Sequence, residues 1–256
     1  MSKLEFFQFP CLSDNYCVLV HDSASGDTAA IDAPETDALR KALAKKGWKL
    51  THILVTHHHY DHTQGIADMK SETGCHVIGP QAEADKIPTL DQTVSDGDSF
   101  VFGGETVDVI STPGHTLGMV NYHFVASGTV FTGDTLFALG CGRVFEGDKN
   151  MMWNSITKLM VLPPETVVYC GHEYTKSNAD FSLTVDPENE ALKTRAAEIA
   201  ALREKGEPTV PTTIELELET NPFMRPSDPG IRAHLGMENA TDAEVFAEIR
   251  TRKDNA

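Results

Sequence analysis

Short runs of β-branched and aromatic residues alternate with amphipathic stretches through the first two thirds of the chain. Such runs, bounded by Gly, Pro, Asn or Asp, are typical of β-strands, whereas apolar residues spaced three and four apart are typical of helices. The pattern predicts strands at residues 4–9, 16–21, 28–31, 51–55, 76–79, 99–101, 106–110, 120–125, 129–132 and 166–170. It predicts helices at residues 36–48, 64–72 and 149–162.

The character of the sequence changes after about residue 172. Residues 187–205 are rich in Ala, Glu, Leu and Arg and predict a helix, and residues 241–252 predict another because they open with Thr-Asp-Ala-Glu, a capping-box pattern. Prolines punctuate residues 208–229 and predict a mostly irregular stretch there. We therefore expect an α/β domain over residues 1–172, followed by an α-helical domain over residues 173–256.

The charge of the chain narrows the choice of partners. Lys and Arg number 21 against 38 Asp and Glu, which gives a net charge of −17. Such a surface repels phosphate backbones and anionic headgroups, so we expect no nucleic acid and no membrane as partner. The first residues show no secretory signal, and the five scattered cysteines without a C-x-x-C are expected to be free thiols in a reducing compartment. We expect a monomeric, cytoplasmic protein.

A cluster of histidines directly follows the predicted strand at residues 51–55. His57, His58, His59 and His62 lie together, with Asp61 among them. If the extended backbone continues, His57, His59 and Asp61 alternate onto one side, and His62 projects from the turn. The segment could then offer two imidazoles to one metal ion, and Asp61 with His62 to a second. The alternative is a chance polar loop or a tag remnant, but a tag is terminal and uninterrupted.

Three further candidate ligands, His115, Asp134 and His172, also follow predicted strands, and each has a glycine beside it. Each alone is weak evidence, because a His or Asp in a glycine turn is more often a solvated loop residue. Two metal sites with three protein ligands each, and positions left for water, require one shared carboxylate. Asp134 is the natural bridge, because a carboxylate has two oxygens.

The H-x-H-x-D-H run, with the later G-H-T, G-D and G-H elements, resembles the metallo-β-lactamase superfamily over about residues 15–175. The resemblance implies an αββα sandwich, the fold of a superfamily of hydrolases. It also implies two sets of metal ligands: His57, His59 and His115 on one ion, and Asp61, His62 and His172 on the other, with Asp134 bridging.

The segments THHHYDHTQG, ALGCGRVFEG, CGHEYT and TNPFMR and the terminal R-x-x-K narrow the resemblance to the glyoxalase II (hydroxyacylglutathione hydrolase) family, over nearly the whole chain. Residues 1–172 would then be the metal-binding catalytic domain, and residues 173–256 the glutathione-binding domain. The implied substrate-binding residues are Arg143, Phe145, Tyr174, Arg250 and Lys253. Arg143 stands where the family has lysine, and Phe145 where it has tyrosine, which removes one hydrogen bond on the order of 1 kcal/mol.

The implied reaction is hydrolysis of S-D-lactoylglutathione, or a similar S-2-hydroxyacylglutathione, to glutathione and D-lactate or another 2-hydroxy acid, the second step of methylglyoxal detoxification. The implied cofactors are two divalent ions, zinc first with iron or manganese as alternatives, which hold a bridging hydroxide. Asp61 is expected to be a ligand that could also orient this nucleophile. Cys141 and Cys170 are expected to be buried rather than nucleophilic, because a metal hydroxide makes a protein nucleophile redundant.

Two alternatives stay open. One is a persulfide (sulfur) dioxygenase, which shares the scaffold and uses a single iron. The other is a non-enzymatic metal-binding protein with a degenerate site. The complete ligand sets and the R-x-x-K tail favour the hydrolase over both.

Overall fold

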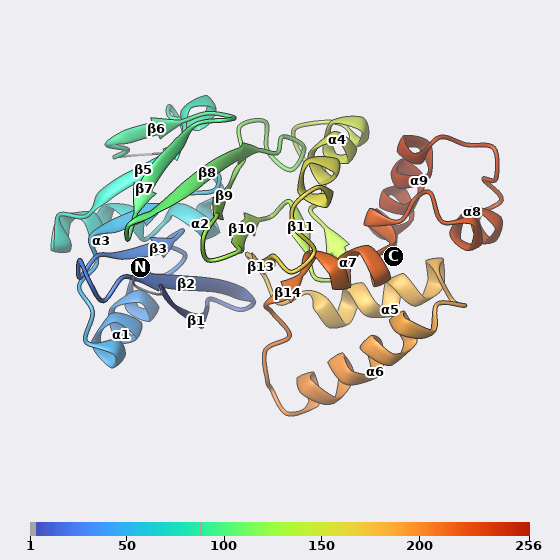
Figure 1. Cartoon of the computed structure of the whole chain (residues 1–256), viewed down its shortest axis with the longest axis horizontal. Coiled ribbons are helices and arrows are strands. Elements are labelled where there is room, and N and C mark those ends of the chain that lie inside the picture. The colour runs from blue at the N-terminus through green and yellow to red at the C-terminus, as the bar shows by residue number, and fades with distance from the viewer. Residues whose placement is uncertain (1–3, 88) are drawn as a thin grey trace. The chain divides into compact units, whose positions relative to one another are not determined.

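The computed structural model describes residues 4–87 and 89–256 (Figure 1). The chain forms two compact units. Unit 1 comprises residues 1–111 and 116–133, and unit 2 comprises residues 112–115 and 134–256. Residues 1–3 and 88 of the predicted first domain lie outside the described residues, and the predicted boundary at residue 172 stays a prediction.

The first sheet of unit 1 has the strand order β1-β2-β3-β4-β5-β6. The strands pair antiparallel from β1 to β3 and parallel from β3 to β6. Their bounds are β1 (Glu5–Cys11), β2 (Asn15–His21), β3 (Thr28–Ile31), β4 (His52–Leu54), β5 (His76–Pro80) and β6 (Gln92–Val94). Because β3 and β4 are parallel neighbours, the residues that follow them emerge at the same edge of the sheet.

Helices α1 (Thr36–Lys46) and α3 (Ile66–Thr73) pack on this sheet. Leu39 and Leu43 of α1, and Ile66 and Met69 of α3, share one apolar cluster with side chains of the sheet. These are the spacings that predicted both helices, because positions three and four apart lie on one helical face. The short α2 (Tyr60–Thr63) and the 3₁₀ turn η1 (Gln81–Glu83) complete the helical segments that unit 1 shows among its described residues.

The second group of strands in unit 1 is antiparallel and contains β7 (Ser99–Phe102), β8 (Glu105–Ser111), β9 (Val120–Phe124) and β10 (Thr129–Gly133). It packs face to face with the first sheet. The Phe6 ring lies 6.4 Å from Phe124 and 6.2 Å from Phe131, and the Tyr122 hydroxyl donates to the Val55 carbonyl. Unit 1 is therefore a two-sheet sandwich with α1 and α3 outside the first sheet (Figure 1).

Unit 2 is mainly helical. Its helical segments are α4 (Lys149–Met160), α5 (Thr175–Val185), α6 (Glu190–Glu204), α7 (Ile214–Thr220), η2 (Pro222–Met224), α8 (Pro229–Leu235) and α9 (Asp242–Asp254). Its strands form two small antiparallel pairs: β11 (Leu136–Phe137) with β12 (Gly140–Cys141), and β13 (Val167–Cys170) with β14 (Thr212–Thr213). The predicted capping box at Thr241 is confirmed, because its hydroxyl accepts from the Glu244 amide and the Glu244 carboxylate accepts in return.

The prediction that residues 208–229 are mostly irregular was wrong. Helix α7 lies within this stretch, and α8 begins at its end. The Thr213 hydroxyl caps α7 by accepting from the Leu216 amide. Pro229 stands at the first position of α8 behind the Asp228 cap, where a proline costs no hydrogen bond. None of the helices among the described residues has the length and apolar character needed to span a bilayer.

Candidate metal centre

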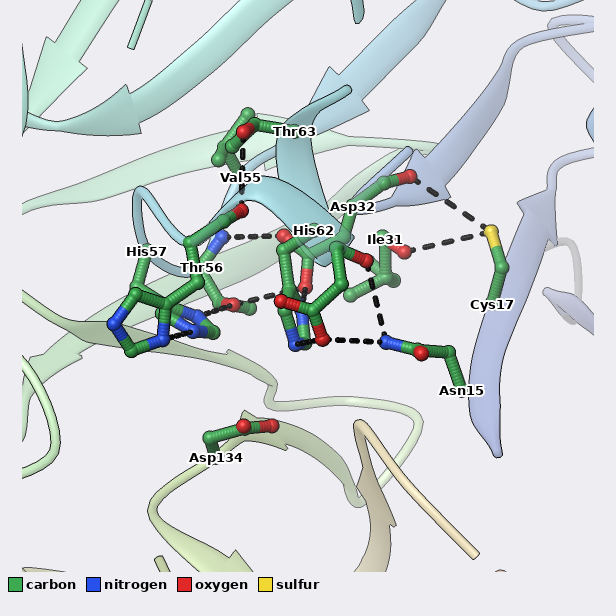
Figure 2. Close-up of polar contacts among 12 residues, drawn as sticks. Asn15, Cys17, Ile31, Asp32, Val55, Thr56, His57, His62, Thr63 and Asp134 are labelled. Atoms are coloured by element: carbon green, nitrogen blue, oxygen red, sulfur yellow. Dashed lines mark hydrogen bonds and ion pairs between the residues drawn. The ribbon is translucent and has the colours of Figure 1, made fainter. Parts of the chain in front are cut away.

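The half of the centre that belongs to unit 1 is built around a buried carboxylate (Figure 2). Asp32 follows β3, and its Oδ2 accepts from His62 Nδ1 at 2.7 Å and from the Thr56 hydroxyl at 2.9 Å. Its Oδ1 accepts from the Thr56 amide at 2.7 Å. The ligating atoms of Asp32, His57 and His62 lie within 4.8 Å of one another, and all three residues are buried. Asp32 thus ties together the ends of β3 and β4.

These hydrogen bonds fix the tautomers of two imidazoles. Because His62 Nδ1 donates to Asp32, the neutral ring keeps its lone pair on Nε2, which lies 3.6 Å from Asp61 Oδ2. The Thr56 hydroxyl gives its proton to Asp32, so His57 Nδ1, 3.0 Å away, donates to it. His57 therefore also keeps its lone pair on Nε2. Lone pairs on imidazole Nε2 atoms are what a metal ion binds.

The expectation that the extended backbone continues from His57 to Asp61 was wrong. The backbone does not stay extended through Asp61: β4 ends at Leu54, and the chain turns into α2 at Tyr60. Asp61 and His62 therefore project from the first turn of a helix, and Tyr60 points to solvent. Asn15 orients Asp61, because its side-chain amide donates to the Asp61 carboxylate at 3.0 Å and to its carbonyl at 3.2 Å.

His58 has a different partner, as expected for a residue outside the ligand set. Its Nδ1 lies 2.9 Å from Glu83 Oε2, and its amide donates to the same oxygen at 2.6 Å. Glu83 is buried and also accepts from the Thr116 hydroxyl and the Gly118 amide. This carboxylate is therefore, beside Asp32, a second anchor of residues 57–62, the histidine loop.

The half that belongs to unit 2 brings three buried ligand candidates together. Asp134 Oδ2 lies 3.4 Å from His115 Nε2 and 3.2 Å from His172 Nε2. His115 Nδ1 donates to the Arg143 carbonyl at 2.8 Å, so its Nε2 lone pair faces the carboxylate. A carboxylate oxygen and an imidazole lone pair are both acceptors, so a cation between them stabilises their approach to 3.2–3.4 Å. The donor set therefore fits a divalent metal ion, with imidazole nitrogens around one carboxylate.

Three predicted substrate-binding residues lie beside these imidazoles in unit 2. The Phe145 ring meets His115 edge to face at 5.3 Å, and the Arg143 guanidinium lies 5.9 Å from the Phe145 ring centre. Tyr174 stacks parallel on His172 at 4.7 Å. Arg143, Phe145 and Tyr174 are all exposed, so they are available to a ligand.

The two other predicted cations of unit 2 are occupied by protein groups. Arg250 is buried, donates to the Cys141 carbonyl at 2.9 Å and donates to Asp254 at 3.0 Å. Lys253 donates to the Ser177 carbonyl at 3.1 Å, and burial, with the positive charge of Arg250, lowers its pKa. Arg143 also lies near a protein carboxylate, with its Nε 3.6 Å from Asp254 Oδ1, but its side chain is the most exposed of the three.

Sequence reasoning missed Asp32, Asn15 and Glu83, which hold the histidine loop. A signal existed for Asp32 alone, because it directly follows the predicted strand at residues 28–31. Strand ends of this kind present functional side chains.

The cysteines near the centre are buried and free, as expected. Burial raises the pKa of Cys141 to about 11 and that of Cys170 to about 12. At pH 8 about one thousandth of Cys141 is then thiolate. We expect the native protein to resist iodoacetamide at pH 8 and to react faster as the pH rises toward 11, as measured by intact-mass spectrometry. Rapid labelling of either thiol at pH 8 with loss of activity would contradict the assignment of both as inert.

Two family models together match residues 14–256. The metallo-beta-lactamase superfamily matches residues 14–172, and the hydroxyacylglutathione hydrolase C-terminus matches residues 173–256. Curated hydroxyacylglutathione hydrolases from Rhizobium etli and Rhizobium meliloti are 60% and 58% identical, each over 100% of both chains. The hydroxyacylglutathione hydrolase from Brucella anthropi is 57% identical over 98% of this chain and 97% of its own.

Solved structures share the fold. ETHE1 from Myxococcus xanthus is 27% identical, with a TM-score of 0.69 over 96% of this chain and 90% of that chain. The BLEG-1 B3 metallo-beta-lactamase is 22% identical, with a TM-score of 0.67 over 86% of this chain and 100% of that chain. The predicted fold class, a metallo-β-lactamase-like α/β sandwich with a C-terminal helical domain, is confirmed. With full-length identity of this degree to curated enzymes, the chain belongs to the hydroxyacylglutathione hydrolases (glyoxalase II) of the metallo-β-lactamase superfamily.

Proposed function

We propose that this chain hydrolyses the thioester of S-D-lactoylglutathione, or of a related S-2-hydroxyacylglutathione, to glutathione and the 2-hydroxy acid. One observation carries the proposal: a complete His and Asp ligand set stands in a chain that matches curated hydroxyacylglutathione hydrolases over their whole length. The persulfide dioxygenase alternative is less well supported, because the curated relatives that are 57–60% identical over nearly the whole chain are hydroxyacylglutathione hydrolases. A monomeric cytoplasmic enzyme acting on a small molecule, without nucleic acid or membrane as partner, completes the proposal.

In this proposal the candidate ligands of both units bind one pair of ions, and the place of two of them in the chain is consistent with it. Asp134 is peptide-bonded to Gly133, and Gly133 packs so closely on Thr56 that an added Cβ would lie 2.7 Å from the Thr56 hydroxyl. Thr56 is in turn peptide-bonded to His57. Since successive Cα atoms lie about 3.8 Å apart, Asp134 and His57 are each one residue from a tight contact within unit 1.

His115 is attached in the same way. It is peptide-bonded to Thr116, whose hydroxyl donates to Glu83, the carboxylate that holds the His58 amide. Two of the three candidate ligands of unit 2, Asp134 and His115, are therefore each joined by a peptide bond to a residue of unit 1, and we propose that they bind the same pair of ions as the histidines of residues 57–62.

Two divalent ions would be held in this centre: His57, His59 and His115 would bind one, Asp61, His62 and His172 would bind the other, and Asp134 would be shared between them. Imidazole and carboxylate ligands suit zinc best, with iron or manganese also possible. When bound, the ions supply an activated water and polarise the thioester carbonyl. Asn15 holds the Asp61 carboxylate in one orientation, so that it can orient the nucleophile as well as bind metal.

The residues around the centre suit a glutathione thioester. Arg143 offers an accessible positive charge to a carboxylate of the peptide, and the rings of Phe145 and Tyr174 offer apolar faces beside the ligand imidazoles. Lys253 adds a second cation at Ser177, and Arg250 supports the loop that carries Arg143 through the Cys141 carbonyl.

Turnover of S-D-lactoylglutathione by the purified chain tests the proposal, with the lactoyl thioester of N-acetylcysteamine as the control substrate. We expect kcat/KM to be on the order of 100-fold higher for the glutathione thioester, because binding energy from remote parts of the substrate contributes to the transition state. Elemental analysis should find about two metal ions per chain. Oxygen uptake with glutathione persulfide, without thioester turnover, would overturn the proposal.

A further inference from the structure

The hairpin β11–β12 in unit 2 is held by side chains from the C-terminal helical region along its whole backbone. Five successive carbonyl groups accept such hydrogen bonds. Phe137 and Gly140 accept from Asn221 Nδ2 (3.4 and 3.1 Å), Ala138 accepts from Asn178 Nδ2 (3.1 Å), Leu139 accepts from the Ser182 hydroxyl (3.2 Å), and Cys141 accepts from Arg250 Nη1 (2.9 Å). The Leu139 amide donates to Glu217 Oε2 at 2.8 Å. A loop held in this way cannot shift without breaking several buried hydrogen bonds.

The turn of the hairpin is strained. Leu139 has a φ of +58°, a left-handed conformation that is unfavourable for a residue other than glycine. Leu136, Ala138 and Leu139 are completely buried. A strained conformation persists only where its surroundings impose it. The surroundings here are the side chains that bind the hairpin carbonyls.

The end of the same hairpin contacts two candidate metal ligands. The Gly142 amide donates to the Thr135 carbonyl at 3.0 Å, and an added Cβ on Gly142 would overlap the carbonyl oxygen of Asp134. The Arg143 carbonyl accepts from His115 Nδ1 at 2.8 Å. A shift of the hairpin would therefore move the Asp134 backbone and release the His115 ring.

Asn221 has the central place among the side chains that hold the hairpin. It is fully buried and donates to two of the five carbonyls. The same side-chain Nδ2 also donates to Glu217 Oε2 at 2.9 Å, and the side-chain Oδ1 accepts from the Phe223 backbone amide at 3.0 Å. Asn221 lies in the TNPFMR segment, which has no role in the metal centre or in the substrate site derived above.

We propose that Asn221 is a positioning residue for the metal centre, acting through the β11–β12 hairpin on the Asp134 carboxylate and the His115 imidazole. The inference rests on the proposed function in so far as it takes Asp134 and His115 as metal ligands. It assigns to the helical region a part in metal binding in addition to the binding of glutathione.

The test compares Asn221→Ala with Asn189→Ala. Asn189 is a matched control, because its side chain also binds backbone groups of unit 2, at Leu192 and Glu219, and neither group belongs to the hairpin. The zinc dissociation constant is measured by competition with a chelator, alongside the Tm of the metal-free protein and kcat and KM. We expect Asn221→Ala to weaken zinc binding by about 10–100-fold and to lower kcat with little change in KM. Asn189→Ala should lower the Tm and leave the zinc affinity unchanged.

A purely structural role of Asn221 predicts a different result. If Asn221→Ala lowers the Tm but keeps the wild-type zinc affinity and kcat, the proposal is overturned. If this variant does not fold, Ser182→Ala, which removes one donor to the Leu139 carbonyl, must weaken zinc binding in the same direction, and an unchanged affinity overturns the proposal equally. Failure of the proposed function is distinguishable, because it would appear in the wild-type chain as an absence of thioester turnover.

Discussion

Replacing Asp134 with Ala is expected to lower kcat for S-D-lactoylglutathione by about 1,000-fold or more and to release metal from the protein. The carboxylate is the shared anionic partner of His115 and His172, whose Nε2 atoms lie 3.4 and 3.2 Å from its Oδ2. Without it, the proposed bridge between the ions is lost, and the imidazoles face one another without a negative charge. The loss is measured as initial rate and as metal per chain after gel filtration.

Asp148→Ala provides the control for this prediction. Asp148 is another aspartate of unit 2, and it caps α4 by accepting from the Met151 amide at 2.8 Å. Its loss should cost about 1 kcal/mol of stability without changing the metal content. Wild-type turnover by Asp134→Ala, with two ions retained, would remove Asp134 from the centre.

Replacing Arg195 with Met should destabilise the protein by about 3–5 kcal/mol, because it leaves the carboxylate of Glu217 buried without its cation. Arg195 and Glu217 form an ion pair inside unit 2, and Glu217 is completely buried. Glu217 also accepts from the Thr212 hydroxyl and the Leu139 amide, so the damage should extend to the hairpin. The effect is measured as the urea midpoint of metal-free protein at constant m-value.

Lys193→Met on the same helix is the matched control. Lys193 pairs with Glu190 on the surface of α6, where solvent screens the charges, so its loss should leave the urea midpoint close to the wild-type value. Adding Glu217→Gln to Arg195→Met should recover part of the lost stability, since it removes the uncompensated charge. Equal midpoints for Arg195→Met and Lys193→Met would show that the buried pair contributes no more than a surface pair.

The candidate ligands were predictable because each follows a strand, and strand ends can be read from local hydrophobic runs. Asp134 follows β10 and His172 follows β13, as expected. Asp32 follows β3 by the same rule, but a single aspartate after a short strand is common, and its partners His62 and Thr56 are distant in sequence. Contacts of this kind depend on which strands become neighbours, and the strand order could not be derived from one sequence.

The helices of unit 2 show a second limit of prediction from the sequence. Helix α5 was not predicted, because its polar segment Thr175–Val185 has no side-chain cap at Tyr174 and gives no clear start signal. Its stability comes from burial of Phe181 and Val185 instead. Arg250 shows the same effect of tertiary structure. The resemblance implied a substrate-binding cation, and packing against Phe223 and the Cys141 carbonyl buries its side chain.

The hydrogen bond between His115 Nδ1 and the Arg143 carbonyl affects which substitutions the enzyme can tolerate over evolution. Because the imidazole is held by a main-chain oxygen, the identity of the side chain at position 143 does not enter this contact. The Arg143 and Phe145 side chains, by contrast, extend to the accessible surface. Substitutions at these two positions should therefore leave the contact that holds His115 in place. The same separation is consistent with the resemblance described above, in which Arg143 and Phe145 stand in place of a lysine and a tyrosine while the candidate ligands are kept.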